Sequence, residues 1–591
     1  MSAHLSDSIG VRLPEVAQSR SRRRSYALCS LAVLFATVVY FWGLGSHHIP
    51  KNGDESPYIN ITRMTAASGH WLPLQSQIDG LRNTKPPLLF WQGIVSTDHG
   101  REWTLWSLRY PSVIYTLFTA VMVFLLVWRC SREVSRSLMG ALAYLAFYST
   151  YRYGRPFLTD PPETFWLTLP FFILLFGTGN AALSRWLPLL LGVAVGVGML
   201  YKSFALIVPI GLGLSVWYLH WRNYRLIEFL RADAWKLIVV AAVSLAMFSC
   251  WFIFDPDPAA VWQDFVVREN AGKFASADAS YVGKLLWGGS SVWVMILGGP
   301  INAGLLALPV AALMGAALHY RRKLSEEERL LWIWFMALVV AFSLPSQRSA
   351  RYLIPAMPAL ATLCGLGWER LRRGWFLITL AACALGAIFL AYESNLLQQA
   401  MASVALYSIG YWLLLLMVVC FCVAAMWVPA LTRLGTPVAV LLIFLSMAAF
   451  LEPFDGLQGN FSSELQRAVT NREVWVPTDF AASYEDYRFL LPTAKIRTYE
   501  ARGQTPAELA GRYPLFVVRL PLGSEVCAGC RVLGKRLDLR GRLSSEDLNR
   551  ILHGKVFQTA VLTEFLVEAV SPHQHEARLS SVTSAFTDPP H

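Results

Sequence analysis

The sequence predicts a polytopic α-helical membrane protein with about thirteen transmembrane helices and a C-terminal α/β domain outside the membrane. Three observations support this fold class. Of the 591 residues, 55% are hydrophobic and only 15% are charged, well below the roughly 25% charged fraction of soluble domains. Long apolar runs recur from residue 26 to residue 451, and the composition turns polar from about Glu452. The 22 Trp and 22 Tyr are typical of a protein that crosses two membrane–water interfaces.

The chain opens with a basic segment, residues 1–25, which we expect in the cytoplasm by the positive-inside rule. The first apolar run, Tyr26–Gly45, is long enough to cross a hydrocarbon core of about 30 Å. Because no small-residue cleavage site closes this run, we interpret it as an uncleaved signal anchor.

The transmembrane domain is expected over residues 26–451. Each connection predicted on the cytoplasmic side carries at least one Arg or Lys. The net charge of +12 is therefore explained by topology, and we expect no nucleic-acid partner. The twelve further predicted spans are Pro111–Trp128, Ser137–Ser149, Thr164–Gly177, Trp186–Leu200, Phe204–His220, Leu237–Phe254, Ile301–His319, Leu330–Leu344, Leu353–Trp368, Trp375–Ala391, Leu406–Val428 and Pro437–Leu451.

An odd number of spans places the C-terminal domain, residues 452–591, on the side opposite the N-terminus. Its tail from about Ser571 has a disordered composition, and for Cys527 and Cys530 we expect a disulfide in an oxidising compartment. A redox site would need a thioredoxin-like context, and two cysteines are too few for structural zinc. The predicted strands are Glu473–Val476, Lys495–Thr498 and Leu515–Leu520, and the predicted helices are Tyr484–Leu491, Thr505–Tyr513 and Ser544–Leu552.

The loop of residues 46–110 carries the densest group of ionisable residues on the external side. It contains the adjacent pair Asp54 and Glu55, a predicted amphipathic helix Ile59–Ser68, and Lys85 before two prolines. A carboxylate at a membrane surface can act as a general base, and of two adjacent residues one faces the reaction while the other supports the loop. The alternative is a solvated turn, because Gly-Asp-Glu-Ser-Pro is ordinary turn composition.

Four cations come from separate loops on the same predicted face: Lys85, Lys202, Arg268 and Arg351. Such a set suits a phosphate or diphosphate, although contact with lipid headgroups is a competing explanation and snorkelling is another for Lys202. Asp160 is expected either to cap the next helix or to contact Arg155 and hold the loop. Carboxylates beside a phosphate-binding set indicate transfer of a group from a lipid-linked phosphate.

These residues resemble the GT-C class of membrane glycosyltransferases, and within it the bacterial aminoarabinose (lipid A) transferase branch of the protein O-mannosyltransferase superfamily. The resemblance covers nearly the whole chain and depends on the order of its segments. The matching segments are Asp54-Glu55 with Tyr58, Gly69-His70-Trp71-Leu72, Lys85-Pro86-Pro87-Leu88, Arg155 with Thr159-Asp160-Pro161, Phe265-Val266-Val267-Arg268-Glu269, and Arg351-Tyr352-Leu353-Ile354-Pro355.

The resemblance implies an inverting transfer of one sugar from a polyprenyl-phosphate-linked donor on the periplasmic face of the bacterial inner membrane. It implies that Asp54, with its neighbour Glu55, supplies the catalytic carboxylate. The donor phosphate would be held by Lys85, Lys202, Arg268 and Arg351, with Tyr352 beside it. The residues expected to support the site are Tyr58, Arg155, Asp160 and Glu269.

Three positions depart from the family pattern. Pro57 stands where the family usually has arginine, Thr84 where it often has Glu, and Asn270 where it often has His. In the aminoarabinose branch the last two positions can hold a metal, and Thr and Asn are poor transition-metal ligands. We therefore expect no zinc site and no other firm cofactor.

The resemblance makes lipid A, or another part of lipopolysaccharide, the leading acceptor. Protein hydroxyls or another envelope glycan are the alternatives within the class, and an O-antigen-ligase-like transferase using a diphosphate donor is a third. A transporter or flippase of lipid-linked sugars is the alternative from another class, although its sites usually lie near the bilayer midplane with repeat symmetry. We expect a monomer embedded in membrane lipids.

Overall fold

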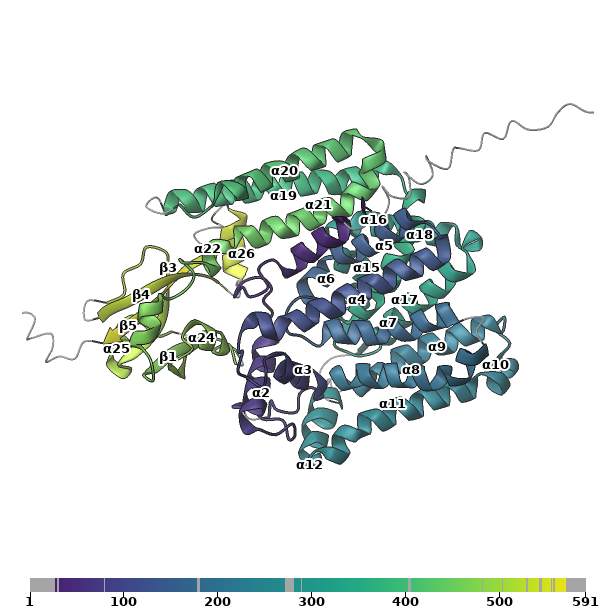
Figure 1. Ribbon diagram of the computed structural model, residues 1–591, viewed down its shortest axis with the longest axis horizontal. Helices are drawn as coiled ribbons and strands as arrows, with labels where there is room; N and C mark the ends of the chain where they lie inside the picture. The colour runs from purple at the N-terminus through teal and green to yellow at the C-terminus, as the bar shows by residue number, and fades with distance from the viewer. Residues whose placement is uncertain are drawn as a thin grey trace, which may run out of the picture.

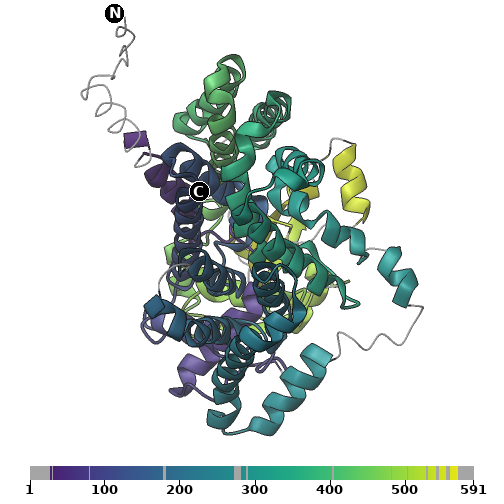
Figure 2. The same ribbon diagram turned by 90° about the vertical axis from the view of Figure 1, so that its right-hand side faces the viewer.

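The computed structural model describes residues 27–28, 31–78, 80–177, 181–271, 281–287, 290–401, 405–480, 482–501, 503–527, 530–540, 545–553, 555 and 559–569. The basic N-terminal segment and the tail from Ser571 lie outside these residues. Figure 1 shows a bundle of long helices with a small sheet domain at one end, and Figure 2 views most of the long helices nearly along their axes.

The helices follow the order of the apolar runs, with additional short helices in the connections. Besides an apolar helix at Leu31–Phe41, the bundle and its connections contain α2 Glu55–Ser68, α3 Leu88–Ser96, α4 Leu105–Ser131, α5 Val134–Ala146, α6 Tyr148–Tyr153, α7 Asp160–Gly177, α8 Ala181–Tyr201, η1 Phe204–Leu206, α9 Ile207–Trp221, α10 Leu226–Ala232, α11 Ala234–Phe254, α12 Pro258–Val261, η2 Trp262–Asn270, α13 Tyr281–Leu286, α14 Val292–Ile296, α15 Gly298–Ala303, η4 Gly304–Leu306, α16 Ala307–His319, η5 Arg321–Lys323, α17 Glu326–Ser343, η6 Ala350–Ala356, α18 Met357–Gly367, η7 Trp368–Arg370, α19 Arg373–Ala400, α20 Ile409–Trp427 and α21 Pro429–Phe450.

Seven helices in the described part of the chain are long and apolar enough to cross a membrane by length and composition. The number of thirteen spans therefore stays a prediction. The run Ser137–Ser149 is divided at Phe147, whose extended backbone separates α5 from α6. The run Leu353–Trp368 begins as the 3₁₀ segment η6 and becomes α-helical only at Met357.

The C-terminal region forms the predicted α/β domain. After α22 (Glu452–Asp455) and α23 (Ser463–Ala468), a five-stranded sheet has the order β2-β1-β3-β5-β4. β1 pairs in parallel with β2 and β3, and β5 pairs antiparallel with β3 and β4. Cys527 and Cys530 form a disulfide. The remaining bounds are β1 Glu473–Thr478, α24 Glu485–Leu490, β2 Lys495–Glu500, α25 Pro506–Arg512, β3 Leu515–Pro521, β4 Cys530–Leu539, α26 Ser545–Leu552 and β5 Val561–Ala569.

The sequence pattern predicted three of these strands and missed β4 and β5. β4 is rich in charge and contains a register shift between Val532 and Gly534, which breaks the alternation of a regular strand. β5 buries Glu564 completely, because the guanidinium groups of Arg519 and Arg536 lie 2.7 and 2.6 Å from its carboxylate. A buried acid in the middle of a strand masks its hydrophobic pattern.

The two domains share one core. Leu537 and Val561 of the sheet domain belong to the same buried cluster as the bundle helices, and Phe454 of α22 connects them. The sheet domain thus packs on the end of the bundle where the loop 46–110 folds.

Candidate functional site

Five charged side chains form a continuous chain of ion pairs at this end of the bundle. Arg351 pairs with Asp54, and its Nη2 also lies 2.7 Å from Asp160 Oδ2. Lys202 Nζ lies 3.3 Å from Asp160 Oδ1 and 2.6 Å from Glu163 Oε2. The signs alternate along the chain, with a carboxylate at each end. The structure thus brings together Asp54, Asp160, Lys202 and Arg351 from four segments far apart in the sequence.

Local structure explains how these residues come together. Asp54 immediately precedes α2, which starts at Glu55, four residues earlier than the sequence pattern predicted. Asp160 lies in the first turn of α7, where a negative charge is favoured by the helix dipole. Arg351 lies in η6, whose start is capped by the Ser349 hydroxyl accepting from the Arg351 N–H. Lys202 directly follows α8.

Burial makes this chain electrostatically unusual. Asp160 and Glu163 are each 1% exposed, whereas the Asp54 side chain is 51% exposed. Burial would raise the pKa of Asp160, but the charges of Lys202 and Arg351 outweigh it and lower that pKa. Burial raises the pKa of Glu163 and outweighs the charge of Lys202, which lowers it. The negative charge of Asp160 adds to the effect of burial, so the pKa of Glu163 rises to about 7.

Tyr58 lies within the same electrostatic field. Its side chain is 6% exposed, and its ring makes an edge contact with Phe90 of α3. Burial, and then the negative charge of Asp54, raise the pKa of Tyr58 well above its usual range, while Arg351 opposes them. Tyr58 therefore stays a neutral hydroxyl next to the charged chain.

Two more of the expected residues form a separate ion pair. Lys85 Nζ lies 2.7 Å from Glu269 Oε1, which joins the loop 46–110 to η2. Between the predicted spans Leu237–Phe254 and Ile301–His319, residues 262–270 form a helix with π-type hydrogen bonds. Arg268 lies on the outer side of this helix, 62% exposed and 3.5 Å from Asp264. Its guanidinium packs over Gly80, where a Cβ atom would be 2.4 Å from Nη1.

Glu55 and Arg155 support the loop. The Glu55 carboxylate accepts from Arg109 Nε and Nη2 at 2.6 and 2.8 Å, and from the Phe157 N–H at 2.7 Å. Glu55 and Arg109 are 3% and 2% exposed. The possible contact between Arg155 and Asp160 is wrong. Arg155 donates hydrogen bonds to the carbonyls of Tyr40 and Trp42. Asp160 forms its ion pairs with Arg351 and Lys202. The reason is that Arg155 is fully buried under the first helix.

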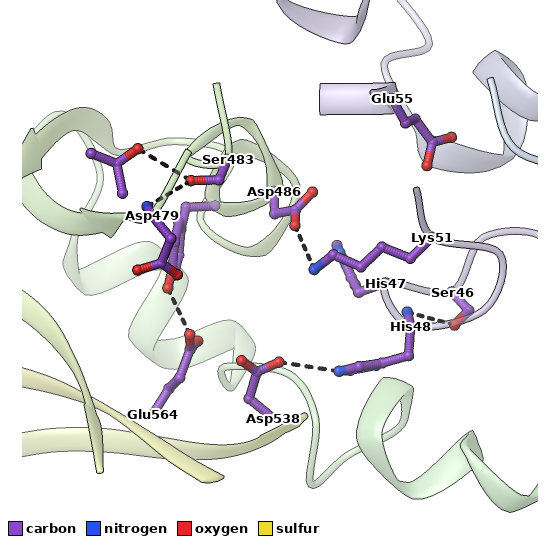
Figure 3. Close-up of polar contacts among 12 residues, drawn as sticks. Ser46, His47, His48, Lys51, Glu55, Asp479, Ser483, Asp486, Asp538 and Glu564 are labelled. Atoms are coloured by element: carbon purple, nitrogen blue, oxygen red, sulfur yellow. Dashed lines mark hydrogen bonds and ion pairs between the residues drawn. The ribbon is translucent and has the colours of Figure 1, made fainter. Parts of the chain in front are cut away.

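Ion pairs connect the sheet domain to the segment just before Asp54. We call the contacts of His48 and Lys51 with this domain the clasp. His48 Nδ1 lies 3.0 Å from Asp455 and its Nε2 3.1 Å from Asp538, while Lys51 lies 2.9 Å from Asp486. Figure 3 shows Lys51 and His48 reaching from the loop to Asp486 and Asp538. Burial would lower the pKa of His48, but the hydrogen bonds that its ring makes to the two carboxylates outweigh burial and raise that pKa.

A cavity of about 480 Å³ lies beside this clasp, between the loop and the sheet domain. Its lining includes Arg63 of α2 and Arg488 of α24, with the stacked rings of Trp103 and Phe489. Both arginines pair with one fully buried carboxylate, Glu485, at 2.8 and 3.4 Å. One carboxylate between two guanidinium groups leaves the wall positively charged.

Thr84 and Asn270, the two positions at which the resemblance would place metal ligands, do not fit a zinc ion. Thr84 donates its hydroxyl to the Leu81 carbonyl at 3.0 Å. Asn270 accepts from Ser203 at 2.8 Å and donates to the Phe265 carbonyl at 2.7 Å. Both side chains are engaged in local hydrogen bonds and offer neither a carboxylate nor an imidazole. The ring of Tyr352 packs against Phe342, with 5.8 Å between centroids.

Sequence reasoning missed three residues of this region. Glu163 lies one helical turn after Asp160, and this i, i+3 spacing in a helix with acidic first-turn residues was the available signal. The role of Arg109 was not predicted because the predicted span began only at Pro111, whereas α4 begins at Leu105. Tyr153 lies under Arg351, whose guanidinium is 4.8 Å from the ring centroid, and nothing in the sequence indicated this contact.

A bundle of apolar helices with a small C-terminal sheet domain is the fold that this chain shares with a solved membrane glycosyltransferase, ArnT. Residues 48–263 match the model of the family described as dolichyl-phosphate-mannose-protein mannosyltransferase. The crystal structure of ArnT from Cupriavidus metallidurans in the apo state superposes with a TM-score of 0.59 at 16% identity, covering 92% of this chain and 98% of ArnT. The same protein bound to undecaprenyl phosphate gives a TM-score of 0.59 at 16% identity, with 91% and 98% covered.

Curated relatives narrow the resemblance to the aminoarabinose transferase type, as the sequence motifs indicated. One is undecaprenyl phosphate-α-4-amino-4-deoxy-L-arabinose arabinosyl transferase 1 of Sodalis glossinidius, 28% identical over 383 residues, which are 61% of this chain and 63% of that protein. Another is the corresponding transferase of Pseudomonas aeruginosa PAO1, 28% identical over 394 residues, with 63% and 66% covered. The chain thus aligns with just under two thirds of the length of these relatives.

Proposed function

We propose that this protein is an inverting membrane glycosyltransferase that moves a sugar from a polyprenyl (undecaprenyl) phosphate donor to an acceptor on the periplasmic face of the bacterial inner membrane. The observation that carries the proposal is the shared position of Arg351, which contacts Asp54 on one side and Asp160 on the other. A cation for the donor phosphate and a half-exposed carboxylate for the acceptor are thereby adjacent. The relatives named for undecaprenyl-phosphate-linked aminoarabinose support the class of donor.

In this mechanism Asp54 accepts the proton of the acceptor hydroxyl as the acceptor oxygen attacks the anomeric carbon of the donor. The bond between that carbon and the phosphate oxygen breaks on the opposite face, which inverts the configuration. The departing polyprenyl phosphate gains a negative charge. Arg351 and Lys202 are placed to stabilise this charge, which is where preorganised cations lower the barrier most. Lys85, Arg268 and Tyr352 complete the proposed donor site from its outer side.

For the acceptor we propose lipid A or another part of lipopolysaccharide. Arg63 and Arg488 line a cavity whose wall is positively charged and carries stacked aromatic rings. Such a wall favours binding of an anionic glycolipid headgroup over binding of a protein acceptor. The lining of the cavity includes Gly45, where the first predicted span ends, and Leu105, where α4 begins. An acylated acceptor anchored in the outer leaflet reaches this place directly.

The test uses the purified full-length protein in lipid nanodiscs with a synthetic polyprenyl-monophosphate sugar and lipid A. We expect released polyprenyl phosphate and a lipid A mass increased by one sugar residue. Asp98→Asn, an exposed loop variant, serves as the control for Asp54→Asn. No release with any monophosphate donor would contradict the proposed activity, and transfer to a peptide hydroxyl in place of lipid A would contradict the proposed acceptor.

A further inference from the structure

The charged chain at the site has more carboxylates than cations. Asp54, Asp160 and Glu163 alternate with Arg351 and Lys202, so three negative charges face two positive ones. Arg351 and Lys202 are the cations proposed above to hold the donor phosphate. The chain therefore carries one net negative charge before any phosphate is bound.

This charge balance opposes the binding of an anion. The donor is a phosphodiester with one negative charge, and the released polyprenyl phosphate approaches two, because the second ionisation of a phosphate monoester lies at a pKa near about 6. Adding this charge beside the buried Asp160 and Glu163 costs free energy unless a carboxylate loses its own charge.

Glu163 is the carboxylate best placed to lose its charge when the phosphate binds. Asp160 lies between two cations, and Asp54 is half-exposed and faces the acceptor in the proposed mechanism. Glu163 is 1% exposed and shares its only ion-pair partner in the described chain, Lys202, with Asp160. Neutralising Glu163 would leave Lys202 to pair with the phosphate.

We propose that Glu163 takes up a proton when the lipid phosphate binds, so that Lys202 exchanges a carboxylate partner for the phosphate. This inference rests on the proposed function. The step is a simple protonation: the Glu163 carboxylate becomes a carboxylic acid, Lys202 stays an ammonium group and no other bond changes. During turnover Asp54 takes the proton that the acceptor hydroxyl loses while the departing phosphate gains one negative charge, so the net charge of the site stays constant. Glu163 keeps the proton that it gained on binding until the lipid phosphate leaves.

The surroundings of Glu163 support this role. The charges that act on it come from Lys202 after α8, from Asp160 on its own helix and from Arg351 in η6. Burial, with the smaller contribution of Asp160, raises the pKa of Glu163 to about 7 against the effect of Lys202, so one proton can be exchanged close to neutral pH.

The test measures proton uptake on lipid binding by calorimetry, in nanodiscs, in two buffers of different ionisation enthalpy between pH 6 and pH 8. The probes are undecaprenyl phosphate and its methyl diester, which keeps a single charge throughout this range. We expect proton uptake by the wild type with the diester, and none from Glu163→Gln. Relative to Glu163→Gln, wild-type affinity should fall about tenfold from pH 6 to pH 8. Glu102→Gln, an exposed loop variant, should follow the wild type.

Identical pH dependence and identical proton uptake in the wild type and Glu163→Gln would overturn the inference. If Glu163→Gln does not fold, the wild type is tested alone with the methyl diester. The diester binds no proton in this pH range, so any proton uptake comes from the protein. Absence of proton uptake overturns the inference. Binding of both lipids without proton uptake leaves the proposed function intact. Failure of the wild type to bind either lipid overturns the proposed function and the inference together.

Discussion

His48 Nε2 lies 3.1 Å from Asp538 of the sheet domain, and the same ring lies 3.0 Å from Asp455. One imidazole thus joins the loop that carries Asp54 to the start of the C-terminal domain and to its edge strand β4. Figure 3 shows the contact with Asp538. The side chains of His48 and Asp538 are 4% and 8% exposed, so water has little access to their contact. The C-terminal domain therefore acts as a support for the loop at the candidate site.

The first prediction concerns this clasp and its pH dependence. His48→Gln should destabilise the protein by about 1–3 kcal/mol at pH 6, because Asp455 and Asp538 lose their ion pairs with His48, although Asp538 keeps Arg536 and Arg519 beside it. The folded-state pKa of His48 is raised, so its contribution is fully present below its unfolded pKa of about 6.5 and is lost as the pH rises through the folded pKa. The difference in unfolding temperature between wild type and His48→Gln should shrink from pH 6 to pH 9.

Thermal unfolding in detergent, followed by intrinsic fluorescence, measures this difference. His70→Gln, at an exposed position of the same loop, is the matched control and should behave as the wild type. A difference that stays constant over this pH range would show that His48 is not charged in the folded protein.

Glu55 should prove to be a structural residue. Glu55→Gln leaves the Arg109 guanidinium buried without a counter-charge, and breaking such a pair costs about 3–5 kcal/mol. We expect a large fall in unfolding temperature, and partial recovery in the double variant Glu55→Gln/Arg109→Met, which removes both charges. Unchanged stability of Glu55→Gln with lost turnover would instead favour a direct role in the reaction.

Asp54→Asn should lower turnover by about 10²–10⁴-fold when the acceptor is a hydroxyl, because the proton acceptor is lost. Donor binding should change little, since Arg351 keeps Asp160 as its partner. Release of polyprenyl phosphate, measured at saturating donor, checks the turnover. Full activity with a hydroxyl acceptor would remove Asp54 from its proposed role.

Arg351→Lys keeps the charge but loses the two-pronged contact with Asp160, which uses Nε and Nη2. We expect kcat/KM to fall about 10–100-fold, with a weakened affinity for undecaprenyl phosphate. Arg101→Lys, whose side chain is 80% exposed, is the control and should retain wild-type values. Equal affinity for the lipid phosphate in Arg351→Lys and wild type would place the phosphate elsewhere.

The cavity beside the clasp gives a prediction about the acceptor. Arg488→Ala should raise the KM for lipid A about tenfold and leave the KM for the donor unchanged, because Arg488 lines the cavity and lies away from the charged chain. Glu485 keeps Arg63 and Asn60 as partners in this variant, so the fold should be retained. Arg497→Ala, an exposed variant of the same domain, is the control. An effect on the donor KM alone would contradict the assignment.

Much of the fold was predictable because its signal is local. A run such as Leu237–Phe254 is recognised as a span by its length and hydropathy, and the structure has a helix at Ala234–Phe254. The predicted strands β1, β2 and β3 follow from their β-branched and aromatic residues. β5 was missed because Glu564 is compatible with a buried strand only when Arg519 and Arg536 lie beside it.

The sequence alone determined that the chain is a membrane helix bundle with a C-terminal α/β domain, and that its external loops carry a set of carboxylates and cations. Only the tertiary structure decided how these charges pair. Asp54 and Glu55 are neighbours, yet Asp54 faces Arg351 while Glu55 is buried against Arg109, because the start of α2 at Glu55 turns the two side chains in different directions. The place of Glu163 in the site was also decided by tertiary structure, because its partner Lys202 is distant in sequence and lies beside it only after α7 and α8 pack together.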